Sequence, residues 1–376
     1  MIYIVCYNSP YVGGGVEQVV RRLVDAFSST FKEDLCLICN DPSQEDEFQY
    51  GGVRCFNLKT ARYNIADRLF FWGRYVYSHR IYTFLKAKAR NGDVVNIHGI
   101  EYALFPSLLR NRIPSDIKLI VTAHGSNFDS ATRYLVRGMP WKLWYVKGFY
   151  FFYRWIIFLM EKLTCYRVDY FTFITKYIRN CYAANYQVKK ETGCVIYNGM
   201  SQVKGKTRQP KKDPRFAALI VGSTVYQKGL DHAEAIIKLL RKQGMEVSLT
   251  AIGFPAHPRV PPDNMAMYYE QADFLLLPSR CEGFPLTVLE ALQHRLPVVV
   301  SKACAFDEVP GHGNVGIVVD NFDYNSWADA IHKSLMDLNQ YNRLVENLNQ
   351  LDLGAFDWNK IAPVYERILK TGTLGP

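Results

Sequence analysis

The chain has 376 residues, of which 49% are apolar and 21% are charged, and this composition excludes a disordered protein. Its length exceeds what one ordinary hydrophobic core serves, so we expect two domains. The formal net charge of +10 favours an acidic partner, such as anionic lipid, nucleic acid or a phosphorylated substrate.

The first half of the chain alternates short apolar runs with longer amphipathic ones, the pattern of a parallel α/β sheet. Residues 2–7 predict a strand, residues 9–15 a glycine-rich loop, and the residues after them a helix. The apolar positions of that helix recur at helical spacing: Val16, Val19, Val20, Leu23, Val24 and Phe27. Further strands are expected at 35–39, 93–99, 118–125, 170–175 and 194–199.

A polar, basic stretch at 202–214 is typical of an interdomain linker, and the alternation restarts after it. Strands are expected at 217–223, 247–253, 273–279, 297–301 and 316–320. Helices are expected at 229–242, 285–293, 324–338 and 356–370. The prediction is an α/β protein with Rossmann-like domains at 1–200 and 201–355, a cleft between them, and a terminal helix at 356–376. Open α/β sheets bind ligands at the carboxyl ends of their strands, so the loops there are candidate sites.

The nine cysteines are an odd number and are scattered along the chain. Several lie in strand-like apolar runs, where cysteine acts as a small buried apolar residue. Only Cys36 and Cys39 form a Cys-x-x-Cys pair, so we expect no metal site and a reducing, cytoplasmic setting. The sequence starts directly with a strand-like run, so no signal peptide is expected. No charge-free apolar run is long enough to span a bilayer.

The segment 278–292, PSRCEGFPLTVLEAL, carries the strongest chemical signal. It follows a predicted strand and opens a helix near Pro285, whose missing N–H costs nothing in a first helical turn. A helix N-terminus offers unpaired N–H groups and a positive dipole end, which suit a diphosphate. Glu282 can accept hydrogen bonds from sugar hydroxyls, and Glu290, two turns along, from a ribose diol. The alternative is that both glutamates are surface residues flanking an ordinary helix start.

This segment resembles the Glu-x7-Glu element of glycosyltransferase family 4, in which E-G-F and a second glutamate follow a strand ending in Pro-Ser. Other resemblances follow in order along nearly the whole chain. They are Gly14-Gly15-Val16-Glu17, residues 93–99, His124-Gly125, residues 195–199, Lys228-Gly229 and the closing helix. The resemblance implies the GT-B fold, with an N-terminal acceptor-binding domain, a C-terminal nucleotide-sugar-binding domain, and a final helix that crosses back to the N-terminal domain.

The resemblance also implies roles for single residues. Glu282 would hold the transferred sugar, Glu290 the donor ribose, and Lys228 would neutralise the departing diphosphate. His124 would hydrogen-bond the donor sugar near its reacting carbon. The diphosphate would lie against four residues: Gly283, Phe284, Pro285 and Leu286. The implied reaction is glycosyl transfer with retention of configuration, without a metal or a separate cofactor, because the nucleotide diphosphate sugar is itself the donor substrate.

Two departures from the family pattern bear on the donor site. Ser223 lies where the family usually has an arginine, five residues before Lys228, which removes one cation from the diphosphate. Either the Ser223 and Thr224 hydroxyls compensate together with a nearby cation, or activity is weaker, or the donor lies differently. The segment between residues 255 and 273, where the family has an extra strand and helix, is shortened here, and Gly253, Phe254 and Pro255 are candidates for stacking on the base.

Three more positions are candidates for ligand contact. His98 ends a strand and is assigned to the acceptor side, although a lone histidine is often a satisfied core residue. Gly14 and Gly15, between a strand and a helix, predict close approach of a phosphate or acceptor, the alternative being a flexible turn. Their loop is not G-x-G-x-x-G, which excludes a dinucleotide site of that type.

Residues 133–167 interleave aromatic side chains with lysines and arginines, against the single acid Glu161. This pattern is typical of a segment that lies on an anionic membrane surface, the alternative being a buried helix with a basic exposed face. Nucleic acid is not expected as a partner, because no recognised binding motif accompanies the charge.

The sequence thus predicts a transferase peripheral to the inner face of the plasma membrane. It would move a sugar from a nucleotide-sugar donor to a lipid-linked or glycan acceptor in cell-envelope polysaccharide, lipopolysaccharide or glycolipid synthesis. The alternative is a catalytically weakened protein of the same fold that binds a nucleotide sugar or a partner transferase at the membrane, and Ser223 favours it.

Overall fold

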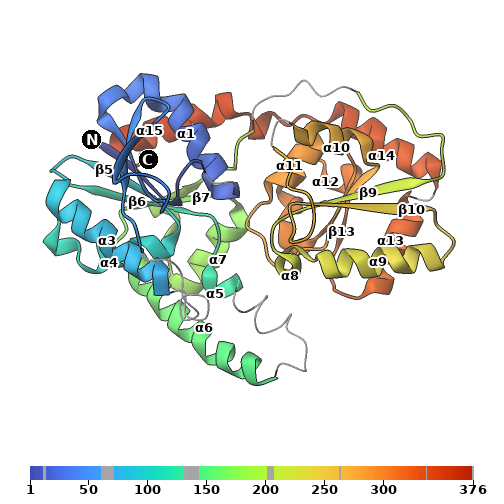
Figure 1. The fold of residues 1–376 in the computed structure, drawn as a ribbon, viewed down its shortest axis with the longest axis horizontal. Coiled ribbons are helices and arrows are strands. Elements are labelled where there is room, and N and C mark those ends of the chain that lie inside the picture. The colour runs from blue at the N-terminus through green and yellow to red at the C-terminus, as the bar shows by residue number, and fades with distance from the viewer. Residues whose placement is uncertain are drawn as a thin grey trace. The chain divides into compact units, whose positions relative to one another are not determined.

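The computed structural model describes residues 1–11, 14–60, 72–130, 132, 144–200, 207–261, 264–335 and 337–374. The chain divides into two compact units. Unit 1 comprises Met1–Gly199 and Trp358–Pro376, and unit 2 comprises Met200–Asp357. Both units are built on largely parallel sheets with helices between the strands, as the alternating apolar pattern predicts (Figure 1).

The sheet of unit 1 has the strand order β3-β4-β2-β1-β5-β6-β7-β8. The strands are β1 (Ile2–Asn8), β2 (Leu35–Asn40), β3 (Glu47–Tyr50), β4 (Val53–Asn57), β5 (Val94–His98), β6 (Lys118–Ala123), β7 (Tyr170–Phe173) and β8 (Gly193–Val195). Each pairs in parallel except β3, which is antiparallel to β4 at the edge. The helices are α1 (Gly15–Phe31), α3 (Trp72–Lys88), α4 (Leu104–Leu108), α5 (Asn127–Ser130), α6 (Trp144–Cys165), α7 (Lys176–Tyr186) and α15 (Trp358–Thr371).

The sheet of unit 2 is parallel throughout, in the order β10-β9-β11-β12-β13. Its strands are β9 (Phe216–Val221), β10 (Val247–Ile252), β11 (Phe274–Leu277), β12 (Val298–Ser301) and β13 (Gly316–Val319). The helices are α8 (Val225–Lys228), α9 (Leu230–Lys242), α10 (Met265–Gln271), α11 (Leu286–Gln293), α12 (His312–Val315), α13 (Tyr324–Leu335) and α14 (Leu338–Gln350). Every strand expected from the sequence is present, with ends shifted by a few residues.

The C-terminal helix α15 returns to unit 1, as expected. Its apolar stripe of Ile361, Tyr365, Ile368 and Leu369 is buried in one cluster with residues of α1 and the strands beside it. Figure 1 shows α15, in red, beside α1, in blue. A Cβ at Gly199, where the first segment of unit 1 ends, would lie 2.4 Å from the ring of Trp358, the first residue of α15, so glycine there allows the returning helix to pack closely.

Two details of the sequence prediction are wrong. The expected helix at 324–338 ends at Leu335, and a separate helix begins at Leu338, because the side chain of Asp337 accepts a hydrogen bond from the N–H of Asn339 as an N-cap. The hairpin of β3 and β4 was not expected, since β3 is short and alternates exposed and half-buried residues at the sheet edge. Of the linker expected at 202–214, residues 207–214 are described and have neither helix nor strand.

Candidate functional site

The loop between β11 and α11 carries the segment with the strongest sequence signal. β11 is buried along its whole length, and α11 begins at Leu286, so Pro285 lies at the N-cap position, one residue earlier than a first-turn proline. Pro285 provides no side-chain cap for the helix. Phe284 is buried and stacks on Phe356 with ring centroids 5.5 Å apart, which anchors the loop. The helix start is therefore held firmly while its amides receive no side-chain cap.

Lys228 and Glu282 form an ion pair within unit 2. The Lys228 Nζ lies 2.7 Å from the Glu282 Oε1. The Glu282 side chain is only 7% exposed. Burial lowers the pKa of Lys228, but the charge of Glu282 outweighs it, so the pKa of Lys228 is raised and the ammonium stays charged.

Gly229 brings Lys228 beside the Glu282 loop. It has a φ of 75° and ends α8 directly before α9. A Cβ at this position would lie 2.2 Å from the carbonyl oxygen of Pro278, at the end of β11. Only glycine combines this backbone conformation with such close approach, which is the physical reason for the Lys-Gly pair seen in the sequence.

Arg280 joins the same two loops, and its role was not expected from the sequence. Its guanidinium donates to both carboxylate oxygens of Asp231 at 2.8 and 2.7 Å, and to the carbonyl of Tyr226 at 2.6 Å. The same group lies 3.9 Å above the Tyr226 ring. The Arg280 N–H donates to the Gln227 carbonyl at 2.8 Å. A nearly buried arginine therefore ties the segment before Lys228 to the segment before Glu282.

Glu290 has a partner that the sequence did not reveal. Its Oε2 accepts a hydrogen bond of 2.6 Å from the hydroxyl of Tyr269 on α10, the short helix in the segment where the family pattern is shortened. Tyr269 is buried, and its ring stacks on His294 with centroids 5.4 Å apart. Burial and the Glu290 charge raise the pKa of Tyr269 well above its usual value, so the hydroxyl remains a donor.

The loops after β9 and β10 meet at two glycines. A Cβ on Gly253, whose φ is 85°, would lie 2.7 Å from the carbonyl oxygen of Gly222. Ser223 follows Gly222 and is exposed. Phe254 is 1% exposed, so its ring does not offer a face to a base as the sequence suggested. Gly253 thus allows two strand ends to approach closely, and Ser223 lies open beside them.

In unit 1, His98 and His124 contact each other. The His98 Nδ1 lies 3.0 Å from the His124 Nε2, and the rings are stacked at 5.2 Å. Burial lowers the pKa of His124 to about 4. Burial and repulsion from His124 hold the pKa of His98 well below its usual value. The pair is therefore neutral near neutral pH, with one ring donating to the other.

The glycine-rich loop before α1 is also shaped by an acidic side chain. The Oε1 of Glu17, which is nearly buried, accepts a hydrogen bond of 2.7 Å from Asn8. Its other oxygen lies 2.0 Å from where a Cβ on Gly14 would stand. The close approach at Gly14 is therefore made by Glu17 itself, whereas Gly15 has open space beside it. Gly13 lies outside the described residues.

The structure thus brings the predicted site residues together as two separate pairs. Lys228 and Glu282 meet in unit 2, while His98 and His124 meet in unit 1. Among the residues that the structure describes, no group of three or more His, Cys, Asp or Glu side chains lies together as metal ligands do. Nor does any described helix have the length and apolarity needed to cross a membrane.

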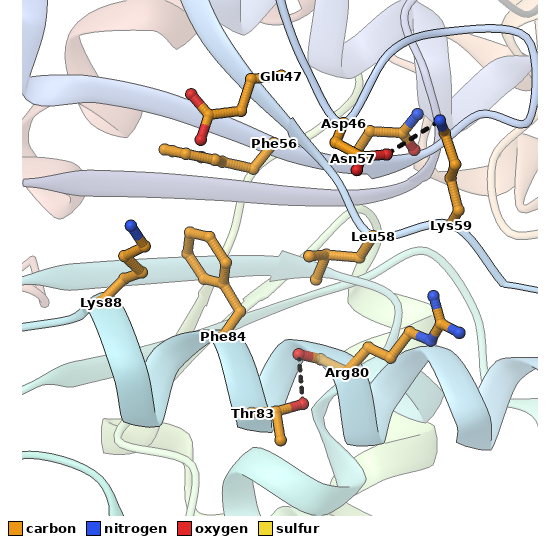
Figure 2. A pocket seen from close by; sticks show the side chains of 10 residues that line it. All are labelled: Asp46, Glu47, Phe56, Asn57, Leu58, Lys59, Arg80, Thr83, Phe84 and Lys88. Carbon is orange, nitrogen blue, oxygen red and sulfur yellow. Dashed lines mark hydrogen bonds and ion pairs between the residues drawn. The ribbon is translucent and has the colours of Figure 1, made fainter.

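A groove of about 530 Å³ lies in unit 1 between the β3–β4 hairpin and α3 (Figure 2). Figure 2 shows Phe56 and Phe84 next to each other in its lining, and their ring centroids are 4.9 Å apart. Lys59 is paired with Asp46 at 2.9 Å on the rim. None of the residues expected to bind donor or acceptor lines this groove.

Two family models match parts of this chain. The family model described as Glycosyltransferase Family 4 matches residues 13–202, and that of Glycosyl transferases group 1 matches residues 254–350. An uncharacterized glycosyltransferase of Methanocaldococcus jannaschii is 25% identical, over 96% of this chain and 96% of that protein.

Two solved structures show the same fold. Sucrose-phosphate synthase of Thermosynechococcus elongatus superimposes with a TM-score of 0.75 at 16% identity, over 98% of this chain and 97% of the other. HepE of Anabaena, solved with UDP and glucose, superimposes with a TM-score of 0.67 at 12% identity, over 98% and 99% of the two chains. With two α/β units whose sheets are largely parallel, the chain has the GT-B fold expected from its sequence.

Proposed function

Because this chain belongs to glycosyltransferase family 4, we propose that it transfers a sugar, with retention of configuration, from a nucleotide diphosphate sugar to a lipid-linked or glycan acceptor. The observation that carries the donor assignment is the ion pair of Lys228 and Glu282, 2.7 Å long and immediately before the start of α11. A cation and a helix N-terminus together suit a diphosphate, and the carboxylate suits sugar hydroxyls.

The pair can serve the donor without being broken. An ammonium has three N–H donors, so Lys228 can keep its contact with Glu282 and still reach a phosphate oxygen. Glu282 fixes where that ammonium lies, and Arg280 fixes the loops that bear both residues. A preorganised cation of this kind stabilises the charge that develops on a departing diphosphate.

Glu290 and Tyr269 form the second part of the proposed donor site. Tyr269 occupies one carboxylate oxygen of Glu290 and thereby orients the other. An oriented carboxylate accepts well from the two hydroxyls of a ribose. Related proteins support the nucleotide assignment, because HepE was solved with UDP and glucose. Ser223, Gly253 and residues 283–286 complete the proposed surface.

The reaction we propose needs no intermediate bound to the protein and no metal. The acceptor oxygen forms a bond with the anomeric carbon on the face from which the diphosphate leaves. The bond from that carbon to the phosphate oxygen breaks, and the acceptor's proton passes to the departing phosphate oxygen. Neutral His124, next to His98, is assigned to the sugar hydroxyls near the reacting carbon, and His98 to the acceptor side. The acceptor is proposed to lie at the cytoplasmic face of the membrane.

Release of nucleotide diphosphate from a panel of UDP-, GDP- and ADP-sugars, with and without a membrane lipid extract, tests this proposal. Glu282→Gln keeps the size of the side chain but removes the charge, and we expect it to lower release at least about 100-fold. Glu246→Gln, an exposed residue of the same unit, is the matched control and should release at the wild-type rate. Undiminished release by Glu282→Gln would remove this residue from the mechanism. Binding without release by the wild-type chain would favour the catalytically weakened alternative.

A further inference from the structure

Helix α6 of unit 1 has one face that packs on the unit and an opposite face that is apolar and exposed. The buried face consists of Tyr153, Ile157, Glu161 and Thr164, which recur at helical spacing. The exposed face has its own helical spacing and continues just beyond the end of the helix. Its side chains, between 43% and 85% exposed, are Phe152, Trp155, Ile156, Leu159, Leu163 and Tyr166. We call these six residues the α6 stripe.

Such a stripe is unusual on a soluble surface. Large apolar side chains are commonly exposed singly. A continuous row of six instead marks a surface that a membrane or another molecule covers. Figure 1 shows α6, in green, leading away from the sheet of unit 1 with part of its length beyond the neighbouring helices. Packing of α6 against the rest of unit 1 therefore does not explain why its exposed face is apolar.

Positive charge accompanies the stripe. The guanidinium of Arg154 lies 4.3 Å above the ring of Phe151 and 5.2 Å from that of Trp155. Lys162 and Arg167 are exposed, and the one acid of α6, Glu161, is buried on the opposite face. An apolar row with cations at its margin complements an anionic bilayer, into which the rings insert while the cations contact headgroup phosphates.

We propose that the α6 stripe docks unit 1 on an anionic lipid surface. The apolar side chains enter the boundary between headgroups and acyl chains, and Lys162 and Arg167 pair with lipid phosphates. This inference rests on the proposed function only in taking the acceptor to be lipid-linked. The expectation from the sequence covered residues 133–167, of which 133–143 lie outside the described residues, and the structure narrows it to this face of one helix.

The helix that docks also holds the loop after His124. The Glu161 carboxylate accepts hydrogen bonds from the backbone N–H of Asn127 at 2.7 Å and of Phe128 at 3.3 Å, and from the hydroxyl of Ser126 at 3.1 Å. The Tyr186 hydroxyl donates to the same carboxylate. Burial raises the pKa of Glu161 above its usual value, against the effect of these donors. Docking of α6 would therefore fix the position of the loop after His124 relative to the bilayer. A lipid-linked acceptor lies in that bilayer.

Flotation of the full chain with vesicles tests the docking. The vesicles are phosphatidylcholine alone or phosphatidylcholine mixed with phosphatidylglycerol. The wild-type chain should bind the mixed vesicles, bind less as salt is raised, and bind the neutral vesicles weakly. The double variant Phe152→Ser and Leu159→Ser should bind at least about tenfold less tightly, because both side chains lose their place in the lipid. Lys162→Gln with Arg167→Gln should weaken binding to the anionic vesicles about fivefold per charge.

A matched double variant in unit 2 controls for loss of apolar surface as such. Phe322→Ser and Met267→Ser remove a phenylalanine and an aliphatic side chain that are 45% and 49% exposed, and this variant should float like the wild type. Wild-type binding by the α6 double variant would overturn the proposal. Failure of the wild-type chain to bind the mixed vesicles would also overturn it. So would sedimentation that shows a dimer of the wild-type chain and a monomer of the α6 double variant.

Nucleotide diphosphate release in the absence of vesicles separates this proposal from the proposed function. The α6 double variant should release nucleotide diphosphate at the wild-type rate, since its substitutions are exposed. If Glu282→Gln is fully active while the α6 variant loses vesicle binding, the proposed function fails and the docking surface stands. If Glu282→Gln is inactive while both proteins float alike, the docking proposal fails and the proposed function stands.

Discussion

The contact between buried His98 and partly buried His124 predicts a specific dependence of stability on pH. His124 has a pKa of about 4 in the folded protein against the usual 6.5. The folded state thus binds fewer protons than the unfolded state between these values. The stability that His124 contributes is present above about pH 6.5 and is lost as the pH falls towards about 4. This difference in pKa corresponds to a loss of about 3 kcal/mol in the free energy of unfolding in full. Of this, about 2 kcal/mol is lost between about pH 7 and about pH 5.

His124→Gln tests this magnitude, because glutamine can reach His98 but does not titrate. Urea unfolding would be followed by tryptophan fluorescence at a series of pH values. Five of the six tryptophans belong to unit 1, so the signal reports chiefly on the unit that holds the pair. We expect the wild type to lose about 2 kcal/mol more than His124→Gln between about pH 7 and about pH 5.

His79→Gln is the matched control for that experiment, since His79 is an exposed histidine of the same unit. It should follow the wild-type dependence on pH throughout. If His124→Gln also follows the wild type, within about 0.5 kcal/mol, protonation of His124 is not the source of the pH dependence.

Three further predictions concern unit 2. Gly229→Ala should destabilise this unit by about 2 kcal/mol or more in urea unfolding, because its φ is positive and the added Cβ meets a carbonyl oxygen at 2.2 Å; an unchanged midpoint would contradict the close approach. Arg280→Lys loses the two-pronged contact with Asp231, which is 42% exposed, so we expect only about 1 kcal/mol in stability but about a tenfold fall in kcat/KM for the donor. A loss of stability with an unchanged kcat/KM would indicate a merely structural role. Tyr269→Phe should raise the donor KM several-fold by freeing Glu290, and a change in kcat alone would contradict the ribose assignment.

The local features of the site follow from sequence. The apolar run of β11, the helix start at α11 and the glycine at 229 are each encoded in adjacent residues, so pattern and spacing predict them. Lys228 and Glu282 were assigned to the donor separately, on the family resemblance, and their ion pair is a finding of the structure.

Contacts between distant residues could not be predicted in the same way. Arg280 and Asp231 are 49 positions apart, and Tyr269 and Glu290 are 21 apart. Their meeting depends on how strands β9 and β11 pair and on how α10 packs, which periodicity does not specify. One signal was present: an arginine shortly after a buried strand needs a partner, and an aspartate shortly after Lys228-Gly229 was available.

The apolar stripe of α6 shows another limit of the sequence. Composition indicated a basic aromatic segment, but aromatic and aliphatic residues occur on both the buried face and the exposed face of the helix. Tyr153 and Ile157 are buried, whereas Trp155 and Ile156 are exposed, and hydropathy does not separate them. Only the packing of α6 on unit 1 shows which side is left open.

Calorimetric titration of the nucleotide diphosphate measures whether Lys228, held by Glu282, binds the diphosphate of a nucleotide sugar. Lys228→Met should weaken binding at least about tenfold, or about 1.4 kcal/mol. The double variant Lys228→Met and Glu282→Gln, which leaves no unpaired carboxylate, should bind as weakly. Lys238→Met, an exposed lysine of α9, should bind like the wild type. Wild-type affinity in both variants lacking Lys228 would show that this residue does not bind the diphosphate.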